Sequence, residues 1–569
     1  MKKLSDLHEV FVSFKAEKIE GTSIVFFNKG LKLDLVEADA LSRYSYVVGG
    51  GAGKKEERRS KIFFAERYGG DGILRNGGGG RCGFDGDFQL KGIGPNQLVA
   101  KDAVFADGNG LMSLNSAIYE TVWSEIINIA LPYGAARSVA VIDTGLKFEC
   151  ENKTYLRGLL VRMPTVRPAH FISAIYFRER HVGALSNDAK RVRLAVSKLV
   201  EFLPLDHGGC LSGSLHERLY LGLRELAKRY ARQFAAARVK QIIHFNVTPS
   251  NLTLDGAWID FSSVRIFSDL IPVDRDDYER FVGEHIPAIE SIRNICYYLS
   301  KYKVVGLDDA NEIAESSVDE FLGEYDRQFN LHCAMRMGFP AVLLNHVLDS
   351  GVFIEFAAVV KELLVFDDLS MRFVTNETGW KGYECWGFRL YAALLRGKVL
   401  GVEPDFIALN VEPTLLKALV IAYGNFFDFL CCKARSVGVS FRNLVVGMAI
   451  NVVRVNHVDV ALTGLEGSID DVVGSGNDST NRVGRLVEDV VGVACLQFYN
   501  EDGVRVPYWV SRSLEIWFDI ASGFYVLKQT GQDLYSVKCL SRFNVQNPEV
   551  LKAIAFYAGI WDVVDEGGR

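Results

Sequence analysis

Residues 77–94 read GGGGRCGFDGDFQLKGIG, so four consecutive glycines are followed by Arg81 and then, on an expected short strand, by Lys91. Backbone N–H groups of consecutive glycines can approach a phosphate closely, because no Cβ stands in the way. Arg81 and Lys91 supply positive charge for the same anion. This segment favours a nucleotide-binding loop, although a glycine-rich loop tip without any ligand explains the glycines equally well.

Residues 244–261, HFNVTPSNLTLDGAWIDF, supply two oxygen ligands of the kind that Mg²⁺ prefers. Asn251 and Asp260 are nine residues apart across an expected hairpin, so both side chains can converge on one ion. A plain turn explains Asp255-Gly256 in the middle of the segment. It does not explain Asp260, because a carboxylate on a buried strand needs a partner.

The order of the expected elements places these two segments in different parts of one fold. Glycine-rich β-type segments dominate the first 160 residues, and a helix is expected over 113–131, where Glu120 can pair with Lys91. From about residue 186 the pattern turns helical. The strands are expected at 22–27, 32–36, 61–65, 88–91 and 138–143, and the later helices at 211–239, 287–302 and 318–337.

We therefore predict an α+β protein with a protein-kinase-like bilobal fold. Residues 1–165 are expected to form a small β-rich N-lobe with the glycine-rich nucleotide loop, and residues 166–340 a larger helical C-lobe with the metal-binding hairpin. Residues 341–569 are expected to form a mainly helical C-terminal extension, with a loop at the Gly-, Ser-, Asp- and Asn-rich residues 464–481.

Composition narrows the functional classes. The chain has 569 residues, and 64 Lys and Arg against 70 Asp and Glu give a net charge of −6, which argues against a nucleic-acid partner. The ten cysteines include no Cys-x-x-Cys pair, so neither a zinc ribbon nor a dithiol motif is expected. Asn425 and Asp428 interrupt the most apolar stretch, 418–432, and no signal peptide is expected. These features predict a cytoplasmic protein with no membrane partner.

From about Gly78 to Phe339, a little under half of the chain, the sequence resembles the selenoprotein O family. Members are pseudokinase-fold enzymes that transfer AMP from ATP to protein hydroxyls. The motifs that carry the resemblance are QLKGIGP at 89–95, Ser124-Glu125 on the first expected helix, and the spacing of Asn251 and Asp260. The resemblance implies ATP as cosubstrate, Mg²⁺ or Mn²⁺ as the metal, and a protein, peptide or small-molecule acceptor.

The resemblance also implies individual roles. Lys91 matches the phosphate-binding lysine of the family and Glu120 its partner on the helix, while Asn251 and Asp260 match the metal ligands. The remaining matches are to residues that contact the nucleotide, namely Gly78, Gly80 and Arg81 in the glycine-rich loop, the pair Asp107 and Gly108, and the phosphate-binding Arg162 and Arg167. The last two are two residues closer together than in the family pattern.

The departures from the family concern the catalytic base. The aspartate that precedes the metal-binding asparagine is replaced by Ser250, and in the His-x-Asp register of small-molecule phosphotransferases the base position holds Asn246. The aspartate of the glycine-rich loop is replaced by Gly79. Loss of a general base lowers a rate about 10²- to 10⁴-fold, whereas positioning and electrostatic stabilisation survive.

Three functions follow from this residue set. The chain can transfer AMP to an acceptor that is already ionised, such as a carboxylate, or transfer AMP slowly to a hydroxyl with a base from elsewhere. It can also be a catalytically impaired pseudokinase that binds ATP and Mg²⁺ as a regulatory module. Label from the γ position of ATP alone would indicate an ordinary phosphotransferase.

Overall fold

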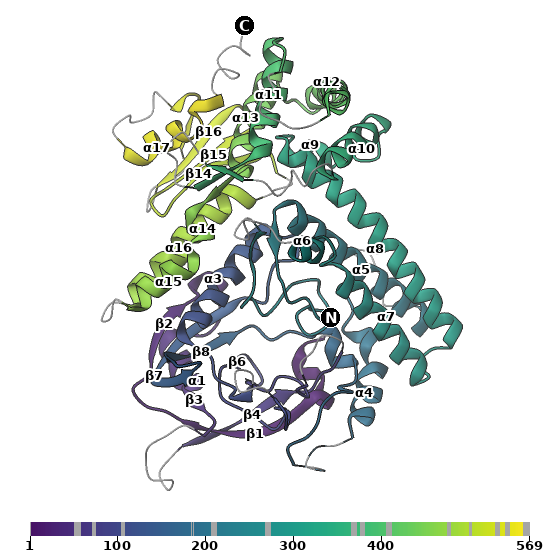
Figure 1. Ribbon diagram of the computed structural model, residues 1–569, viewed down its shortest axis with the longest axis vertical. Coiled ribbons are helices and arrows are strands. Elements are labelled where there is room, and N and C mark those ends of the chain that lie inside the picture. The colour runs from purple at the N-terminus through teal and green to yellow at the C-terminus, as the bar shows by residue number, and fades with distance from the viewer. Residues whose placement is uncertain are drawn as a thin grey trace.

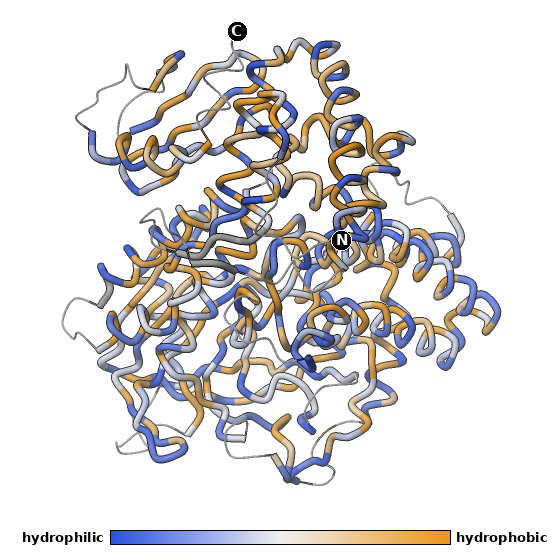
Figure 2. The backbone as a smooth tube through the Cα atoms, turned by 45° about the horizontal axis from the view of Figure 1, so that its top comes forward, coloured by the Kyte–Doolittle hydropathy of each residue, from blue (hydrophilic) through white to orange (hydrophobic). Residues whose placement is uncertain are grey.

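The computed structural model describes residues 2–49, 59–70, 75–103, 108–181, 183, 185, 187–205, 213–267, 275–365, 373–375, 382–404, 412–474, 479–499, 503–529, 535–540 and 547–560. Within them the protein is α+β, with a large sheet at one end of the molecule and helices and a second sheet at the other (Figure 1). Hydrophobic and hydrophilic residues alternate along the helices, as expected for helices with one buried face (Figure 2).

An eight-stranded sheet is built from the first 162 residues. Its strand order is β2-β7-β8-β6-β5-β4-β1-β3, and all neighbouring strands are antiparallel. Strand β6 lies near the middle, between β5 and β8. The strands are β1 (Phe11–Lys18), β2 (Ser23–Phe27), β3 (Tyr46–Val47), β4 (Ser60–Glu66), β5 (Cys82–Phe84), β6 (Gln89–Lys91), β7 (Ser138–Cys150) and β8 (Lys153–Arg162).

The described residues of this part of the chain include the helices α1 (Glu37–Tyr44) and α3 (Leu114–Ala130). Helix α3 begins after Ser113, whose hydroxyl accepts the backbone N–H of Ser116, and it packs against β7 and β8. The strand expected at 32–36 is absent, because a short turn over Lys29–Leu31 leads directly toward α1.

The next part of the chain is mainly helical. Helices α5 and α8 are the longest of the described elements and pack along each other. Between α5 and α6 the described residues form two short strands, β9 (Ile242–Ile243) and β10 (Arg265–Ile266), on either side of the expected hairpin. The helices are α4 (Asp188–Ser197), α5 (Leu215–Val239), α6 (Arg275–Val282), α7 (Ile286–Lys301) and α8 (Leu307–Arg336).

The chain after residue 340 is helical at first and then forms a second sheet. Its described helices are α9 (Ala341–Leu344), α10 (Gly351–Val365), α11 (Trp386–Leu400), α12 (Pro413–Ser436), α13 (Phe441–Val455), α14 (Val460–Thr463), α15 (Leu465–Gly474), α16 (Ser479–Phe498) and α17 (Pro548–Phe556). Strands β11 (Phe373–Thr375), β12 (Gly382–Cys385) and β13 (His457–Asp459) form a small sheet. Strands β14 (Arg505–Val510), β15 (Leu514–Asp519), β16 (Phe524–Gln529) and β17 (Tyr535–Val537) form a four-stranded antiparallel sheet that the sequence patterns did not predict.

The loop expected at 464–481 is wrong where the structure describes it. Residues 465–474 form α15, and α16 begins at residue 479. Leu465 and Ile469 of α15 are buried in the same hydrophobic cluster as Ile118 and Val122 of α3, so this part of the extension returns to cover α3 (Figure 1). Burial against α3 therefore outweighs the low helix propensity of the Gly, Ser and Asp residues.

Helix α12 is the one described helix that is long and apolar enough to cross a membrane by length and composition, with a mean hydropathy of 1.6 over its most apolar 18 residues. The core helix of a soluble protein passes the same test. In this structure the α12 side chain of Phe426 packs against Phe339 and Phe356, with ring centroids 4.9 Å apart in both pairs. Part of the apolar surface of α12 is therefore used in the second hydrophobic core.

Candidate functional site

Strand β6 presents Gln89 and Lys91 on one face of the sheet and Leu90 on the other, because successive residues of a strand alternate. Leu90 is buried in a hydrophobic cluster, while Lys91 and Gln89 meet polar partners from other elements. In the register between β6 and β8, Gln89 lies directly opposite Arg162. The sheet thus brings an amine and a guanidinium to neighbouring positions.

Helix α3 supplies the partner of Lys91. The Lys91 ammonium donates to both carboxylate oxygens of Glu120, at 2.7 and 2.9 Å. Both side chains are only 2% exposed. Ion pairs out of water are maintained only when the geometry is good, so this pair orients Lys91 rather than merely neutralising it.

Asp260 connects the helical part of the chain to the cations of the sheet. One of its oxygens accepts from the Lys91 ammonium and, at 2.8 Å, from Arg162, while the other lies 3.6 Å from Arg167. Lys91 and Asp260 are 169 residues apart in the sequence. The Asp260 side chain is 19% exposed, whereas the three cations around it are exposed by no more than 3%.

The charges around Asp260 determine its protonation. Burial favours the neutral form, but the charges of Arg162, Lys91 and Arg167 hold the pKa of Asp260 well below its usual range. The carboxylate is therefore ionised at pH 7. Its backbone has a φ of 68°, in the left-handed region that non-glycine residues seldom adopt and that is enriched at functional sites.

A tight hairpin places Asn251 opposite Ile259, the residue before Asp260. The backbone N–H of Ile259 donates to the carbonyl of Asn251 at 3.1 Å, and Leu252 forms a bridge with Trp258. The Asn251 amide nitrogen donates to the carbonyl of Asn246 at 2.7 Å, which directs the amide oxygen away from that carbonyl. Two oxygen-bearing side chains thus lie on adjacent positions of one hairpin.

Buried His244 forms a hydrogen bond to the backbone of this hairpin. Its Nε2 donates to the carbonyl of Ile259 at 3.0 Å, which assigns the proton to that nitrogen. Burial lowers the pKa of His244 to about 4, so the ring is neutral at pH 7. His244 therefore acts as a structural residue for the loop that carries Asn251.

Ser250 occupies the position expected for a catalytic base. Its hydroxyl lies 2.8 Å from that of Thr248 and 3.4 Å from the Asn251 amide oxygen, and its carbonyl accepts from Arg167 at 2.9 Å. No carboxylate among the described residues is hydrogen-bonded to Ser250. The serine is therefore neither a base nor activated by one in this arrangement.

The glycine-rich segment differs from the sequence expectation. Gly77 to Gly80 are all buried, and three of their N–H groups already have acceptors: Gly77 donates to Leu98, Gly79 to Glu66 and Gly80 to Gly78. Those three groups are therefore not free to bind a phosphate. Close packing requires Gly77, Gly78 and Gly80 instead, and the tightest case is Gly78, where a Cβ would lie 2.1 Å from the Glu66 carbonyl oxygen.

This packing predicts opposite outcomes for two neighbouring substitutions. Gly78→Ala places its Cβ against backbone at a φ of 143°, so we expect a loss of at least about 2 kcal/mol in the free energy of unfolding. Gly79→Ala meets its nearest atom at 3.4 Å, an ordinary contact, and is expected to cost less than about 1 kcal/mol. Urea unfolding of the two variants checks this, and equal losses would contradict it.

The other residues expected to contact the nucleotide are placed as follows. Arg81 follows the glycines and, within the described part of the chain, forms no ion pair, so its charge is available to a ligand. The carbonyl of Gly108 accepts from Arg180 at 3.5 Å, in the segment before α3. Asp107 lies outside the described residues.

A second layer of buried polar residues holds the arginines, and the sequence patterns indicated no role for two of its members, Gln89 and Glu66. The Gln89 amide oxygen accepts from Arg162 and, at 3.4 Å, from Arg167, while its nitrogen donates to Glu66. His170 accepts the Arg167 backbone N–H at Nδ1, so its Nε2 carries the proton that bonds Glu66 at 3.0 Å. The position of Gln89 in the QLKGIGP motif was the sequence signal that could have identified it as a site residue.

Burial and nearby charges keep Glu66 of this layer ionised and His170 neutral. Burial opposes the charge on Glu66, but the His170 hydrogen bond and Arg167 bring the pKa of Glu66 below its usual value. Burial lowers the pKa of His170, so the ring is neutral at pH 7. Glu66 therefore balances the positive charge of Arg167, and Gln89 ties both arginines to β6.

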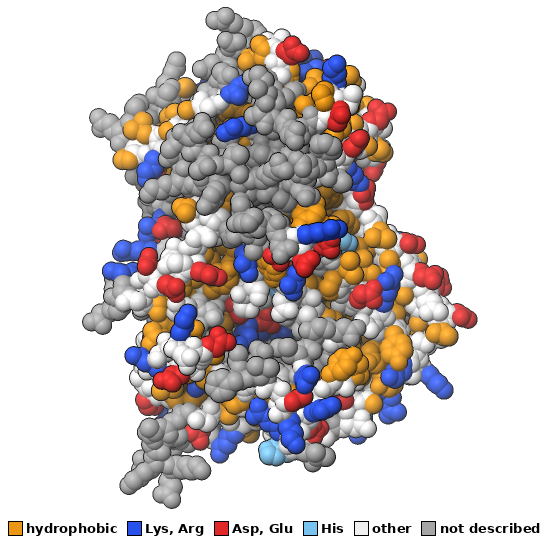
Figure 3. All heavy atoms as spheres, viewed as in Figure 1, with side chains coloured by type: hydrophobic (Ala, Val, Ile, Leu, Met, Phe, Trp, Pro, Cys, Tyr) orange, Lys and Arg blue, Asp and Glu red, His pale blue; other side chains and the backbone are white. Residues whose placement is uncertain are grey.

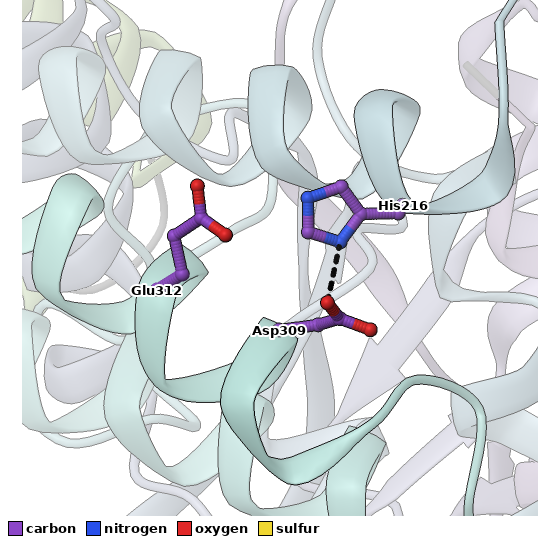
Figure 4. Close-up of side chains that lie close together, drawn as sticks. All are labelled: His216, Asp309 and Glu312. Carbon is purple, nitrogen blue, oxygen red and sulfur yellow. Dashed lines mark ion pairs between the residues drawn. The ribbon is translucent and has the colours of Figure 1, made fainter.

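A surface group at the start of α5 and α8, His216, Asp309 and Glu312, lies apart from this site (Figure 4). His216 Nδ1 is 3.8 Å from Asp309, and both acidic residues are exposed. Exposed acidic groups beside a histidine are common at helix N-termini without any ion. The group needs no ion to explain it, and we assign it no site.

Comparison with known proteins does not identify the chain. No family model matches it, and no curated protein matches its sequence. The residues around Asp260 therefore provide the evidence on function.

Proposed function

We propose that the protein is an ATP- and Mg²⁺-dependent nucleotidyltransferase with a protein-kinase-like bilobal fold, resembling selenoprotein O. It transfers AMP to a protein or peptide hydroxyl, or to an ionised carboxylate. One observation carries the proposal: the Lys91 ammonium from the sheet pairs with the carboxylate of Asp260 from the second part of the chain. This carboxylate is ionised and partly exposed.

The residue set fits a magnesium triphosphate. Mg²⁺ is usually held by one or two protein oxygen ligands together with substrate phosphates, and Asn251 and Asp260 would supply those ligands here. Lys91, Arg162 and Arg167 would bind the phosphates, with Arg81 as a further cation. The bound metal would neutralise negative charge that develops on the phosphates.

Hydrogen bonds to neighbouring side chains already orient the cations Lys91, Arg162 and Arg167. Glu120 orients Lys91, and Gln89 orients both arginines, so binding a triphosphate exchanges the ion pairs of Asp260 for phosphate contacts without reorganising the sheet. Preorganised charge of this kind supplies most of the catalysis in phosphoryl-type transfer. These residues therefore bind, orient and stabilise, and none of them removes a proton from the acceptor.

The absence of a base at Ser250 favours an acceptor that is already ionised. A carboxylate with a pKa near 4 needs no deprotonation at pH 7, whereas a serine hydroxyl does. The same observation favours the alternative of an ATP-binding regulatory module, because a hydroxyl acceptor would react about 10²- to 10⁴-fold more slowly without a base. Labelling distinguishes these cases.

The full chain is incubated with Mg²⁺, a cell lysate and ATP labelled at either the α or the γ phosphate. We expect label from the α position on the chain itself or on lysate proteins. Hydroxylamine distinguishes the acceptor, because it removes AMP from a carboxylate but not from a hydroxyl.

Each other outcome has a definite meaning. Label from the γ position alone would establish a phosphotransferase. No label together with tight, Mg²⁺-dependent ATP binding would establish the regulatory module. Neither label nor ATP binding would reject the nucleotide site altogether. An Asp309→Asn chain is the matched control, because that exposed carboxylate lies on the surface group described above and should leave labelling unchanged.

We also propose a cytoplasmic protein whose partners are ATP and an acceptor, without nucleic acid or membrane. On the face shown in Figure 3, the described Lys and Arg side chains are interspersed with Asp and Glu. A surface that carries both charge signs supports the absence of a nucleic-acid partner, because nucleic-acid-binding proteins gather positive charge on one face.

A further inference from the structure

A cavity of about 430 Å³ lies where the helical part before residue 340 meets helices α10 and α11. Its wall is formed by side chains of α5, α6, α8, α10 and α11 together with His285, which precedes α7, and includes none of the residues around Asp260. Cavities of roughly 300–1,000 Å³ with a mainly apolar wall and a few polar groups are typical of small-molecule sites. This cavity has that composition.

One wall consists of aromatic rings with similar orientation. Tyr325 of α8 stacks on His285 with ring centroids 4.7 Å apart, and on Phe329 at 6.4 Å and an interplanar angle of 17°. Burial lowers the pKa of His285, so this ring is uncharged at pH 7. Tyr278 and Tyr391 complete the aromatic wall. Such a surface is complementary to another planar aromatic group.

Arg238 adds a cation with unused hydrogen-bonding capacity. Its guanidinium carbon lies 4.1 Å from the centroid of the Phe281 ring, and within the described residues its Nη1 donates to no acceptor although that atom is buried. Burial lowers the pKa of Arg238, but a guanidinium stays charged at pH 7. A buried cationic donor of this kind is costly unless something pairs with it.

The neighbouring carboxyl groups do not supply that partner. Asp326, the one acidic residue in the cavity wall, pairs with Lys361. Both carboxyl oxygens of Glu284 accept backbone N–H groups, from His244 at 3.1 Å and Phe245 at 2.7 Å, and burial raises the pKa of Glu284 to about 8. Arg336 adds a further positive charge to the wall. The described lining is therefore net positive and complementary to an anion.

We propose that this cavity binds a small aromatic carboxylate, with its ring against Tyr325 and Phe329 and its carboxylate hydrogen-bonded to Arg238. The ring provides apolar burial and stacking, and the carboxylate provides the acceptor that Nη1 lacks. The site is independent of the proposed nucleotide site, so either proposal can fail without the other.

The test titrates the full chain with 2-naphthoate and with 2-naphthalenemethanol, which has the same rings without the charge, by isothermal titration calorimetry. We expect one molecule of 2-naphthoate per chain, bound at least about tenfold more tightly than the alcohol, because a hydrogen bond to a charged group contributes about that much. Arg238→Met should abolish this preference, and Arg238→Lys should retain part of it.

Further variants locate the site. Tyr325→Ala should weaken both compounds by a similar factor, since it removes ring contact and leaves Arg238 in place. Arg275→Met is the matched control, because Arg275 is 88% exposed on α6 and pairs only with the exposed Glu279 among the interactions described. Equal affinity of the wild type for both compounds would overturn the proposal, as would a preference that survives Arg238→Met. The difference between the two affinities of the wild type tests the proposal even if a variant fails to fold.

Discussion

Asp260→Asn is expected to abolish the dependence of ATP binding on Mg²⁺ and to lower AMP transfer about 100- to 1,000-fold, the loss typical of removing one preorganised electrostatic contact. The amide keeps the size of the side chain but removes the charge that Lys91, Arg162 and Arg167 share. Those three cations then become more available to phosphate. ATP should therefore bind in EDTA at least as tightly to the variant as to the wild type.

Calorimetric titration of ATP, with Mg²⁺ and with EDTA, measures both effects. The opposite changes in metal dependence and metal-free affinity separate a ligand role from a structural one, because a misfolded site would lose both. Asp255→Asn is the control, since Asp255 lies at the exposed turn of the same hairpin and contacts Thr253. Mg²⁺ dependence that persists in Asp260→Asn would show that Asp260 is not a metal ligand.

Glu120→Ala is expected to lower the free energy of unfolding by about 3 kcal/mol, because removing one partner of a buried ion pair leaves the other charge without adequate compensation. Lys91 retains Asp260 as a partner, which places the effect at the lower end of the usual range. Urea unfolding monitored by tryptophan fluorescence measures the loss. Glu290→Ala removes an exposed pair with Arg293 and should change stability by less than about 0.5 kcal/mol.

The double variant Lys91→Met, Glu120→Leu separates stability from function. Hydrophobic residues of similar volume replace a buried ion pair with little or no loss of stability, so most of the stability lost in Glu120→Ala should return. ATP binding should not return, because the cation from β6 is gone. A double variant as unstable as Glu120→Ala would contradict the ion-pair account, and one that still binds ATP would remove Lys91 from the proposed site.

Local patterns predicted much of the fold. The expected helix over 113–131 is α3, and the helix expected at 211–239 is present from Leu215 to Val239, because the period of buried side chains repeats over several turns. The α+β class follows from these helices and from strands such as β4 and β7. Short patterns were weaker guides: the strand at 32–36 was wrong, and the four strands from β14 to β17 were missed.

The sequence by itself determined which residues could carry chemistry, through the types and spacing of Lys91, Glu120, Asn251 and Asp260. Only the tertiary structure decided their partners: that Arg162 and Arg167 both reach Asp260, that Gln89 holds both arginines, and that the glycine N–H groups are used by neighbouring backbone. The reason is that a helix or strand pattern is local, whereas a charge pair depends on the orientation of elements far apart in the chain, which packing alone sets.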